Sequence, residues 1–223
     1  MPTIITGASV TSEGIVTNTL GTSNFVAGVN AGNSITSGGN YNTVVGDEAG
    51  TAITTGDHNT AVGYSSLVAN TTGGQNTASG FKAMFSNTTG EDNTATGYQA
   101  LYANTTGASN AAYGLFALTA NTTASNNTAV GHSSLKANTT GAENIAVGEG
   151  SLTSNTTGAQ NTAVGRKALE LNTTGNYNVA IGQRTLDSNT TGGENTASGY
   201  QALNANTTGT ANVAMGYKAL RLN

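Results

Sequence analysis

The sequence has no cysteine, a single proline and few charged residues, which make up 8% of its 223 residues. Without cysteine, no disulfide can staple the fold and no thiol chemistry is available. Only 7 basic residues stand against 11 acidic ones, so no basic stripe can neutralise phosphates and we expect no nucleic-acid binding. No run of 18 apolar residues occurs, and we expect no membrane insertion. The opening MPTIITGASV has no basic region and is not predicted to be a secretory signal.

A strict repeat separates this chain from disordered polar sequences, which favour charge and proline. Its pattern is N-T-A-V-G-x-x-A-L-x-x-N-T-T-G-x-x, and we number its positions as columns 1 to 17. Ten full copies span 42–211, and a partial copy ends at Asn223. The asparagine of column 1 recurs every 17 residues, at Asn42, Asn59, Asn76, Asn93, Asn110, Asn127, Asn144, Asn161, Asn178, Asn195 and Asn212.

The columns separate an inside from an outside. From Asn42 onward, every charged residue falls in columns 6, 7, 10, 16 or 17. Column 5 is glycine in all eleven copies, column 9 is mostly leucine, and column 12 is asparagine from Asn70 onward. The columns that never carry a charge are predicted to face the interior of the molecule.

The period predicts an all-β fold, a parallel β-solenoid or β-roll of 17-residue coils. Helical-hairpin repeats need roughly 34 to 47 residues, and glycine, threonine and valine disfavour helix. We expect one strand near columns 1 to 4 and another near columns 8 to 13. Glycine in columns 5 and 15 is expected to supply backbone conformations that other residues resist.

Stacked coils would lie ~4.7–4.9 Å apart and bring like residues together in ladders. Stacked asparagine amides bond along such an axis. The asparagine ladders are expected to run from Asn42 to Asn212 and from Asn70 to Asn223. The residues predicted to form structural ladders are Asn59, Asn76, Asn93, Asn127, Asn161, Leu67, Leu101, Leu118, Leu135 and Leu169.

Three regions are expected along the chain. Residues 1–23 are predicted to be an N-terminal arm or attachment segment, 24–41 an atypical first coil of 18 residues, and 42–223 the tandem solenoid. Each coil offers about one leucine and a few alanines, a thin core. Because a lone rod with such a core is marginal, we expect side-by-side association into a homotrimer.

No catalytic, metal or cofactor site is predicted, and we interpret the chain as non-enzymatic. His58 and His132 lie in different columns, without a second ligand at suitable spacing. Neighbouring strand residues face opposite sides, so the pairs 47–48 and 91–92 are poor candidates for paired carboxylates.

Nine NTT sequons and a high threonine content admit further interpretations. We favour an asparagine ladder over N-glycosylation, because glycans every ~4.8 Å would collide. Ice binding is disfavoured, because the complete threonine columns, 13 and 14, are adjacent and would point opposite ways.

Aromatic residues recur in two outward columns. Tyr64, Phe81 and Tyr98 occupy column 6, and Phe85 and Tyr102 occupy column 10. Two hypotheses remain open for these rings. They form either a recognition surface for sugars or a stack that lies ring on ring or in a seam between chains.

The units NTAVGYSSLVANTTG and NTATGYQALYANTTG resemble repeats in bacteriophage fibre proteins, including those of cyanobacterial and marine phages. NIAVG and NVAIG are more distantly similar to the β-roll heads of trimeric autotransporter adhesins. The resemblance covers about residues 24 to 223.

The resemblance implies a virion tail-fibre or head-fibre subunit that acts as a stiff spacer. The implied partners are further copies of the chain, baseplate or capsid proteins through residues 1–23, and host-surface glycans. The alternative is a cell-surface or extracellular filament or adhesin whose coils stack end to end.

Overall fold

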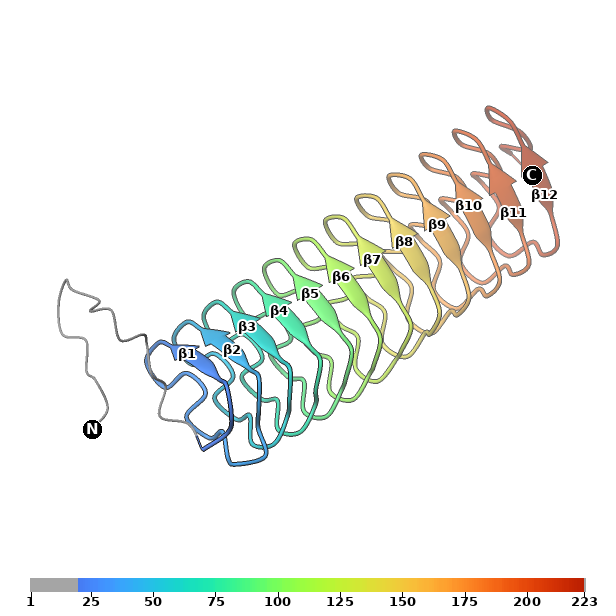
Figure 1. Cartoon of the computed structure of the whole chain (residues 1–223). Helices are drawn as coiled ribbons and strands as arrows, with labels where there is room; N and C mark the ends of the chain where they lie inside the picture. The colour runs from blue at the N-terminus through green and yellow to red at the C-terminus, as the bar shows by residue number, and fades with distance from the viewer. Residues whose placement is uncertain (1–19, 223) are drawn as a thin grey trace, which may run out of the picture.

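The computed structural model describes residues 20–222, which form a single stack of coils (Figure 1). Most of the predicted N-terminal arm, and the last residue of the second predicted ladder, lie outside the described residues. Each coil contributes one strand of three residues. The strands are β1 (Phe25–Ala27), β2 (Thr43–Val45), β3 (Thr60–Val62), β4 (Thr77–Ser79), β5 (Thr94–Thr96), β6 (Ala111–Tyr113), β7 (Thr128–Val130), β8 (Ile145–Val147), β9 (Thr162–Val164), β10 (Val179–Ile181), β11 (Thr196–Ser198) and β12 (Val213–Met215).

The twelve strands form one parallel sheet in which sequence neighbours are also spatial neighbours. The register advances by one repeat per step, as in the pairing of Thr60 with Thr77. Hydrogen bonds continue beyond the strand ends, where Gly63 N donates to Val45 O at 2.8 Å. The predicted parallel β-solenoid is therefore confirmed.

The second predicted strand, near columns 8 to 13, is wrong: columns 8 to 11 form turns, and columns 12 and 13 contain no strand in any described coil. Gln99 and Leu101 have φ of 52° and 53°, left-handed values that side chains with a Cβ seldom adopt. Such residues in columns 7 and 9 interrupt any extended strand. The coils still bond to each other here, since Leu101 N donates to Ala117 O at 2.9 Å.

The two glycine columns serve different purposes. Gly97, in column 5, has φ of +135°, and a Cβ there would lie 2.5 Å from Gly114 O. Gly107, in column 15, does not have a positive φ, which corrects the expectation for that column. A Cβ there would instead lie 2.3 Å from Ala124 O of the next coil and 2.5 Å from Asn104 Oδ1, so glycine makes room for both.

The interior is a narrow file of aliphatic side chains running along the rod. Column 3 alanine and column 9 leucine are buried in the coils between the ends of the stack, as Ala95 and Leu101 illustrate. The five leucines predicted to form a ladder are all fully buried: Leu67, Leu101, Leu118, Leu135 and Leu169.

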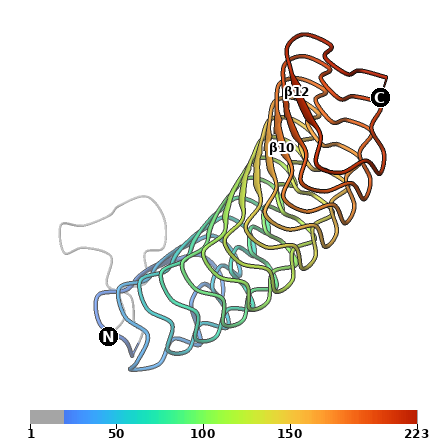
Figure 2. The same ribbon diagram turned by 90° about the vertical axis from the view of Figure 1, so that its right-hand side faces the viewer.

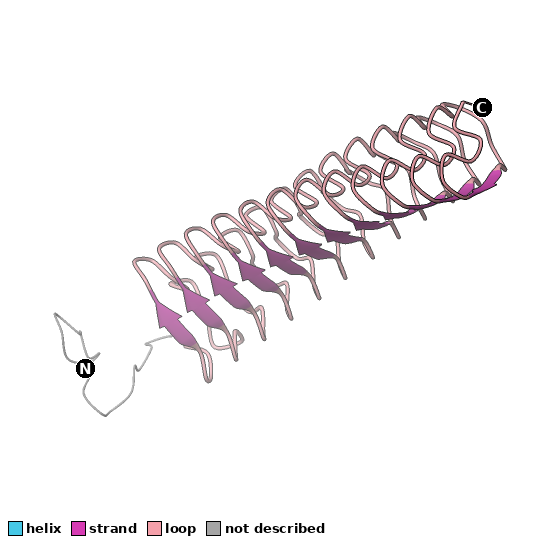
Figure 3. Ribbon diagram, turned by 90° about the horizontal axis from the view of Figure 1, so that it is seen from above, coloured by secondary structure: helices cyan, strands magenta, loops and turns pink. Residues whose placement is uncertain are grey.

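The stack bends along its length (Figure 2). The sheet also turns: its strands present their broad face near β1 and lie nearly edge-on near β12 when viewed from above (Figure 3). No helix capable of crossing a bilayer is present between residues 20 and 222.

Candidate structural and interaction sites

The column 1 asparagines form a buried hydrogen-bonded ladder. Asn93 donates from its backbone N and its Nδ2 to Asn76 Oδ1, at 3.0 and 3.3 Å. The same Nδ2 donates to Gly107 O at 2.8 Å. Each side chain thus links its own coil to the preceding one.

The column 12 asparagines form a second ladder. Asn104 Nδ2 donates to Asn87 Oδ1 at 2.8 Å and to Gly107 O at 2.9 Å. The carbonyl of Gly107 therefore accepts from both Asn93 and Asn104. The column 15 carbonyl joins the two ladders in the same way in most coils, as Gly158 O does between Asn144 and Asn155. The coil of Asn127 differs, because Asn127 Nδ2 donates to Ser125 O instead.

Every amide-to-amide bond runs in the same direction. The later coil donates and the earlier coil accepts, as in the step from Asn121 Nδ2 to Asn104 Oδ1 at 2.9 Å. Buried hydrogen bonds aligned head to tail polarise one another, which strengthens each link. The predicted ladder residues Asn59, Asn76, Asn93, Asn127 and Asn161 all lie in the column 1 file.

The same geometry bears on the NTT sequons. Asn104 is fully buried and its amide is bonded within and between coils. Thr105 donates from its N and its Oγ1 to Thr122 O, at 2.8 and 3.0 Å. A glycan cannot reach such an asparagine in the folded chain, and the threonine that follows it helps to hold the corner.

The predicted aromatic residues form two stacks. Phe81 lies between Tyr64 and Tyr98, with ring centroids 5.5 and 5.1 Å apart and interplanar angles of 17° and 9°. Phe85 and Tyr102 stack at 5.0 Å. Because neighbouring rings cover both faces of Phe81, only the edge of this ring can meet a partner.

A lysine links the two aromatic stacks. Lys82 Nζ lies 5.4 Å from the ring centroid of Phe81 and 5.2 Å from that of Phe85. The first stack ends at Phe116, which meets Tyr98 edge-on at 5.5 Å. These contacts satisfy the rings within one chain and favour the ring-on-ring hypothesis.

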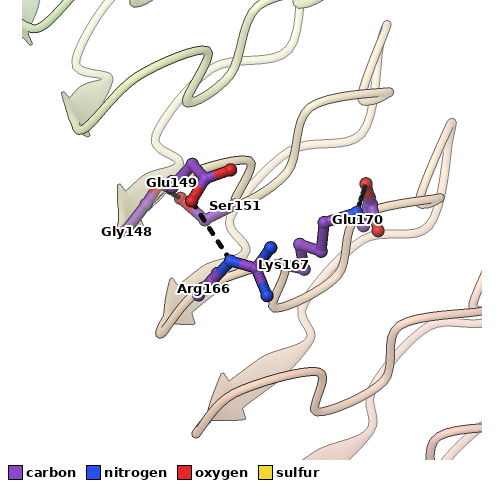
Figure 4. A network of polar contacts seen from close by, with 6 residues as sticks. All are labelled: Gly148, Glu149, Ser151, Arg166, Lys167 and Glu170. Carbon is purple, nitrogen blue, oxygen red and sulfur yellow. Dashed lines mark hydrogen bonds and ion pairs between the residues drawn. The ribbon is translucent and has the colours of Figure 1, made fainter.

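A group of charged side chains, not singled out from the sequence, lies on the later coils. Arg166 Nε contacts Glu149 Oε2 at 3.1 Å, and Lys167 Nζ contacts Glu170 Oε1 at 2.8 Å (Figure 4). Burial, followed by a hydrogen bond to the Glu170 carboxyl, raises the pKa of Asp187. Opposite charges in column 6 of neighbouring coils, and in columns 7 and 10 of one coil, are the sequence signal that could have revealed this group.

The two histidines lie against aromatic rings. His58 stacks on Tyr41 with centroids 4.9 Å apart and an interplanar angle of 9°. His132 lies 6.5 Å from the ring centroid of Phe116. No group of three or more histidine, aspartate or glutamate residues arranged to hold a metal ion occurs within residues 20–222.

Comparisons of this chain with protein-family models, with curated proteins and with solved structures find no match.

Proposed function

We propose that this chain is a non-enzymatic structural protein, a fibre or appendage subunit of a virion that acts as a stiff spacer. The observation that carries the proposal is the unbroken stack of coils, held by two asparagine ladders along its axis. Each step of the rod combines parallel-sheet hydrogen bonds with buried amide links, so bending it strains many bonds together. The resemblance of the repeats to phage-fibre units supports the same role.

Within this proposal the fibre is a homotrimer. One chain has only a thin core, and association of three chains would bury additional surface. Residues 1–23 attach the rod to baseplate or capsid proteins. Host-surface glycans are the proposed distal partner. Because the faces of Phe81 are covered, a sugar would contact the edges of the column 6 rings or the outer ring of a stack.

The proposed role can be tested by locating the protein. We expect immunogold labelling to mark discrete appendages on virus particles, and electron microscopy of the purified protein to show short rods. Labelling of cell surfaces together with long polymers of the purified protein would instead support the alternative, a cellular filament or adhesin.

The role of the aromatic stack has its own test, the replacement of Tyr64, Phe81 and Tyr98 by serine. Loss of cell attachment with an intact oligomer would support glycan recognition. Loss of the oligomer would show that the rings form a seam between chains.

A further inference from the structure

The outward face of the sheet is a continuous surface that neither ladder nor core uses. Columns 2 and 4 flank the buried column 3 and point away from the core, as Thr96 and Ala95 show in β5. We call columns 2 and 4 of β1–β12 the sheet stripe. None of its 24 residues is charged, and every charged residue from Asn42 onward lies in other columns of the coils.

The sheet stripe is rich in exposed apolar side chains. Scattered exposed aliphatic residues are normal on a protein surface, but a contiguous row of them marks an interaction site. Exposed large apolar residues of the stripe are Phe25, Val62, Tyr113, Val130, Ile145, Val164, Ile181, Val213 and Met215. Threonine occupies many of the remaining places, so the row is dominated by β-branched side chains.

The stripe is large enough for a stable interface. Twelve strands at ~4.8 Å spacing and three residues at ~3.3 Å give a strip of about 55 by 10 Å. If two copies each covered about 550 Å², the contact would bury about 1,100 Å² in total, just above the ~1,000 Å² expected of a specific interface.

The shape of the stripe selects its occupant. The sheet turns along the rod and the rod itself bends (Figures 2 and 3). A flat partner, such as an ice lattice or a membrane surface, can therefore touch only part of the stripe. A second copy of this chain has the same turn and the same spacing between coils, and it can follow the stripe from end to end, as helices of matched repeat do in a coiled coil.

We propose that the sheet stripe is the surface through which copies of this chain associate side by side, winding around one another. This proposal rests on the self-association that forms part of the proposed function, and it assigns that association to columns 2 and 4 instead of the aromatic columns. An uncharged stripe suits a buried contact, because the charged columns then remain at its rim and in solvent.

The test compares two triple variants on the same three coils. T96E/V130E/V164E places three carboxylates on the stripe, and T106E/T140E/T174E places three on column 14, whose threonines are also exposed. Mass is measured by light scattering and folding by circular dichroism. We expect the wild type and the column 14 variant to remain oligomers, and the stripe variant to dissociate to 22.1 kDa while folded. Its dissociation constant should rise on the order of 100-fold or more, because unpaired carboxylates would be buried.

A cross-linking experiment covers the case in which the stripe variant fails to fold. The chain contains no cysteine, so Tyr113→Cys in β6 and Thr123→Cys in column 14 each introduce a single thiol. A short bis-maleimide should link copies through position 113 and not through position 123.

Three outcomes would overturn the proposal: a monomeric wild type, equal dissociation of both triple variants, or cross-linking at position 123 alone. Immunogold location on virions is independent of all three. An unsuccessful stripe proposal would therefore leave the fibre role standing, and an oligomer linked through the stripe could equally belong to a cellular filament.

Discussion

The first two coils and the coils from Asn59 onward fill the same core in two different ways. In the first two, column 9 is glycine and column 12 is isoleucine, as at Gly50 and Ile53. A Cβ at Gly50 would lie 2.8 Å from Ile53 Cδ1. The isoleucine therefore reaches from column 12 into the space that leucine fills from column 9 in later coils.

The comparison shows that each coil has one slot for a large aliphatic side chain. When column 9 supplies leucine, column 12 is free to carry asparagine, and the second ladder begins at Asn70. When column 12 supplies isoleucine, that ladder is absent. The column 1 ladder does not depend on this choice, since Asn42 Nδ2 still donates to Gly56 O at 2.9 Å.

The largest effects are expected from introducing the arrangement of the first two coils, glycine in column 9 and isoleucine in column 12, into the middle of the rod. Asn104→Ile should cost about 3–5 kcal/mol, because it overfills an occupied slot and leaves Asn87 Oδ1 unpaired. Leu101→Gly should cost about 3–5 kcal/mol through the cavity it leaves.

The double variant L101G/N104I should be less destabilised than the sum of the singles by about 1–3 kcal/mol. Isoleucine then fills the slot, and glycine suits the left-handed backbone at position 101. Urea denaturation of all four proteins measures this coupling, and simple additivity would disprove a shared slot.

The converse exchange should extend the second ladder by one coil. Ile53→Asn alone is expected to cost about 2–4 kcal/mol, because the slot is left without a large side chain. Adding Gly50→Leu refills the slot, and the asparagine at position 53 can then offer its Oδ1 to Asn70 Nδ2, so most of the loss should be recovered. Thermal unfolding compares the single and double variants. If the double variant recovers no stability, leucine in column 9 cannot replace isoleucine in column 12.

Substitution of the column 5 glycine should cost the same stability in the first two coils and in the later coils. Gly46 and Gly97 have φ of 130° and 135°, and a Cβ at either would lie within 2.6 Å of the next coil's carbonyl oxygen. Gly46→Ala and Gly97→Ala should each cost about 2–3 kcal/mol. Denaturant midpoints check the equality. Gly107→Ala is the control that tests crowding without the strain of a positive φ, and Ala124 shows that this column can accommodate alanine.

The smallest effect is expected at Asp187, in the charged group that only the later coils carry. Burial raises the pKa of Asp187 above its ordinary value of 3.8. The folded chain therefore holds this proton more tightly than the unfolded chain, and stability should fall as pH rises from 3.8 through the higher folded pKa.

Asp187→Asn should remove this pH dependence and be slightly more stable near neutrality, by under about 1 kcal/mol because the carboxyl is only half-buried. Unfolding free energies measured from pH 3.5 to 7 test the sign. A wild-type stability that rises across this range, relative to the variant, would contradict it.

Sequence reasoning succeeded where the period itself carried the information. A repeat too short for helical hairpins predicted stacked parallel coils, and uncharged columns predicted the buried leucines. It failed at Leu101, in the stretch of columns 8 to 13 where a strand was expected, because its left-handed backbone is imposed by closing the coil and not by local propensity. It also misassigned the reason for Gly107, because a glycine required by the close approach of neighbouring atoms looks the same in sequence as a glycine required by a positive φ.

The sequence by itself determined the period, the residues that repeat along the axis and the division into inside and outside, because identical spacing forces like residues into register once coils stack. Only the tertiary structure decided that each coil has one strand, that two asparagines share the column 15 carbonyl, and that isoleucine in column 12 replaces leucine in column 9. It also decided that the sheet stripe turns along the rod. These features depend on the path of the chain through three dimensions, which no single column encodes.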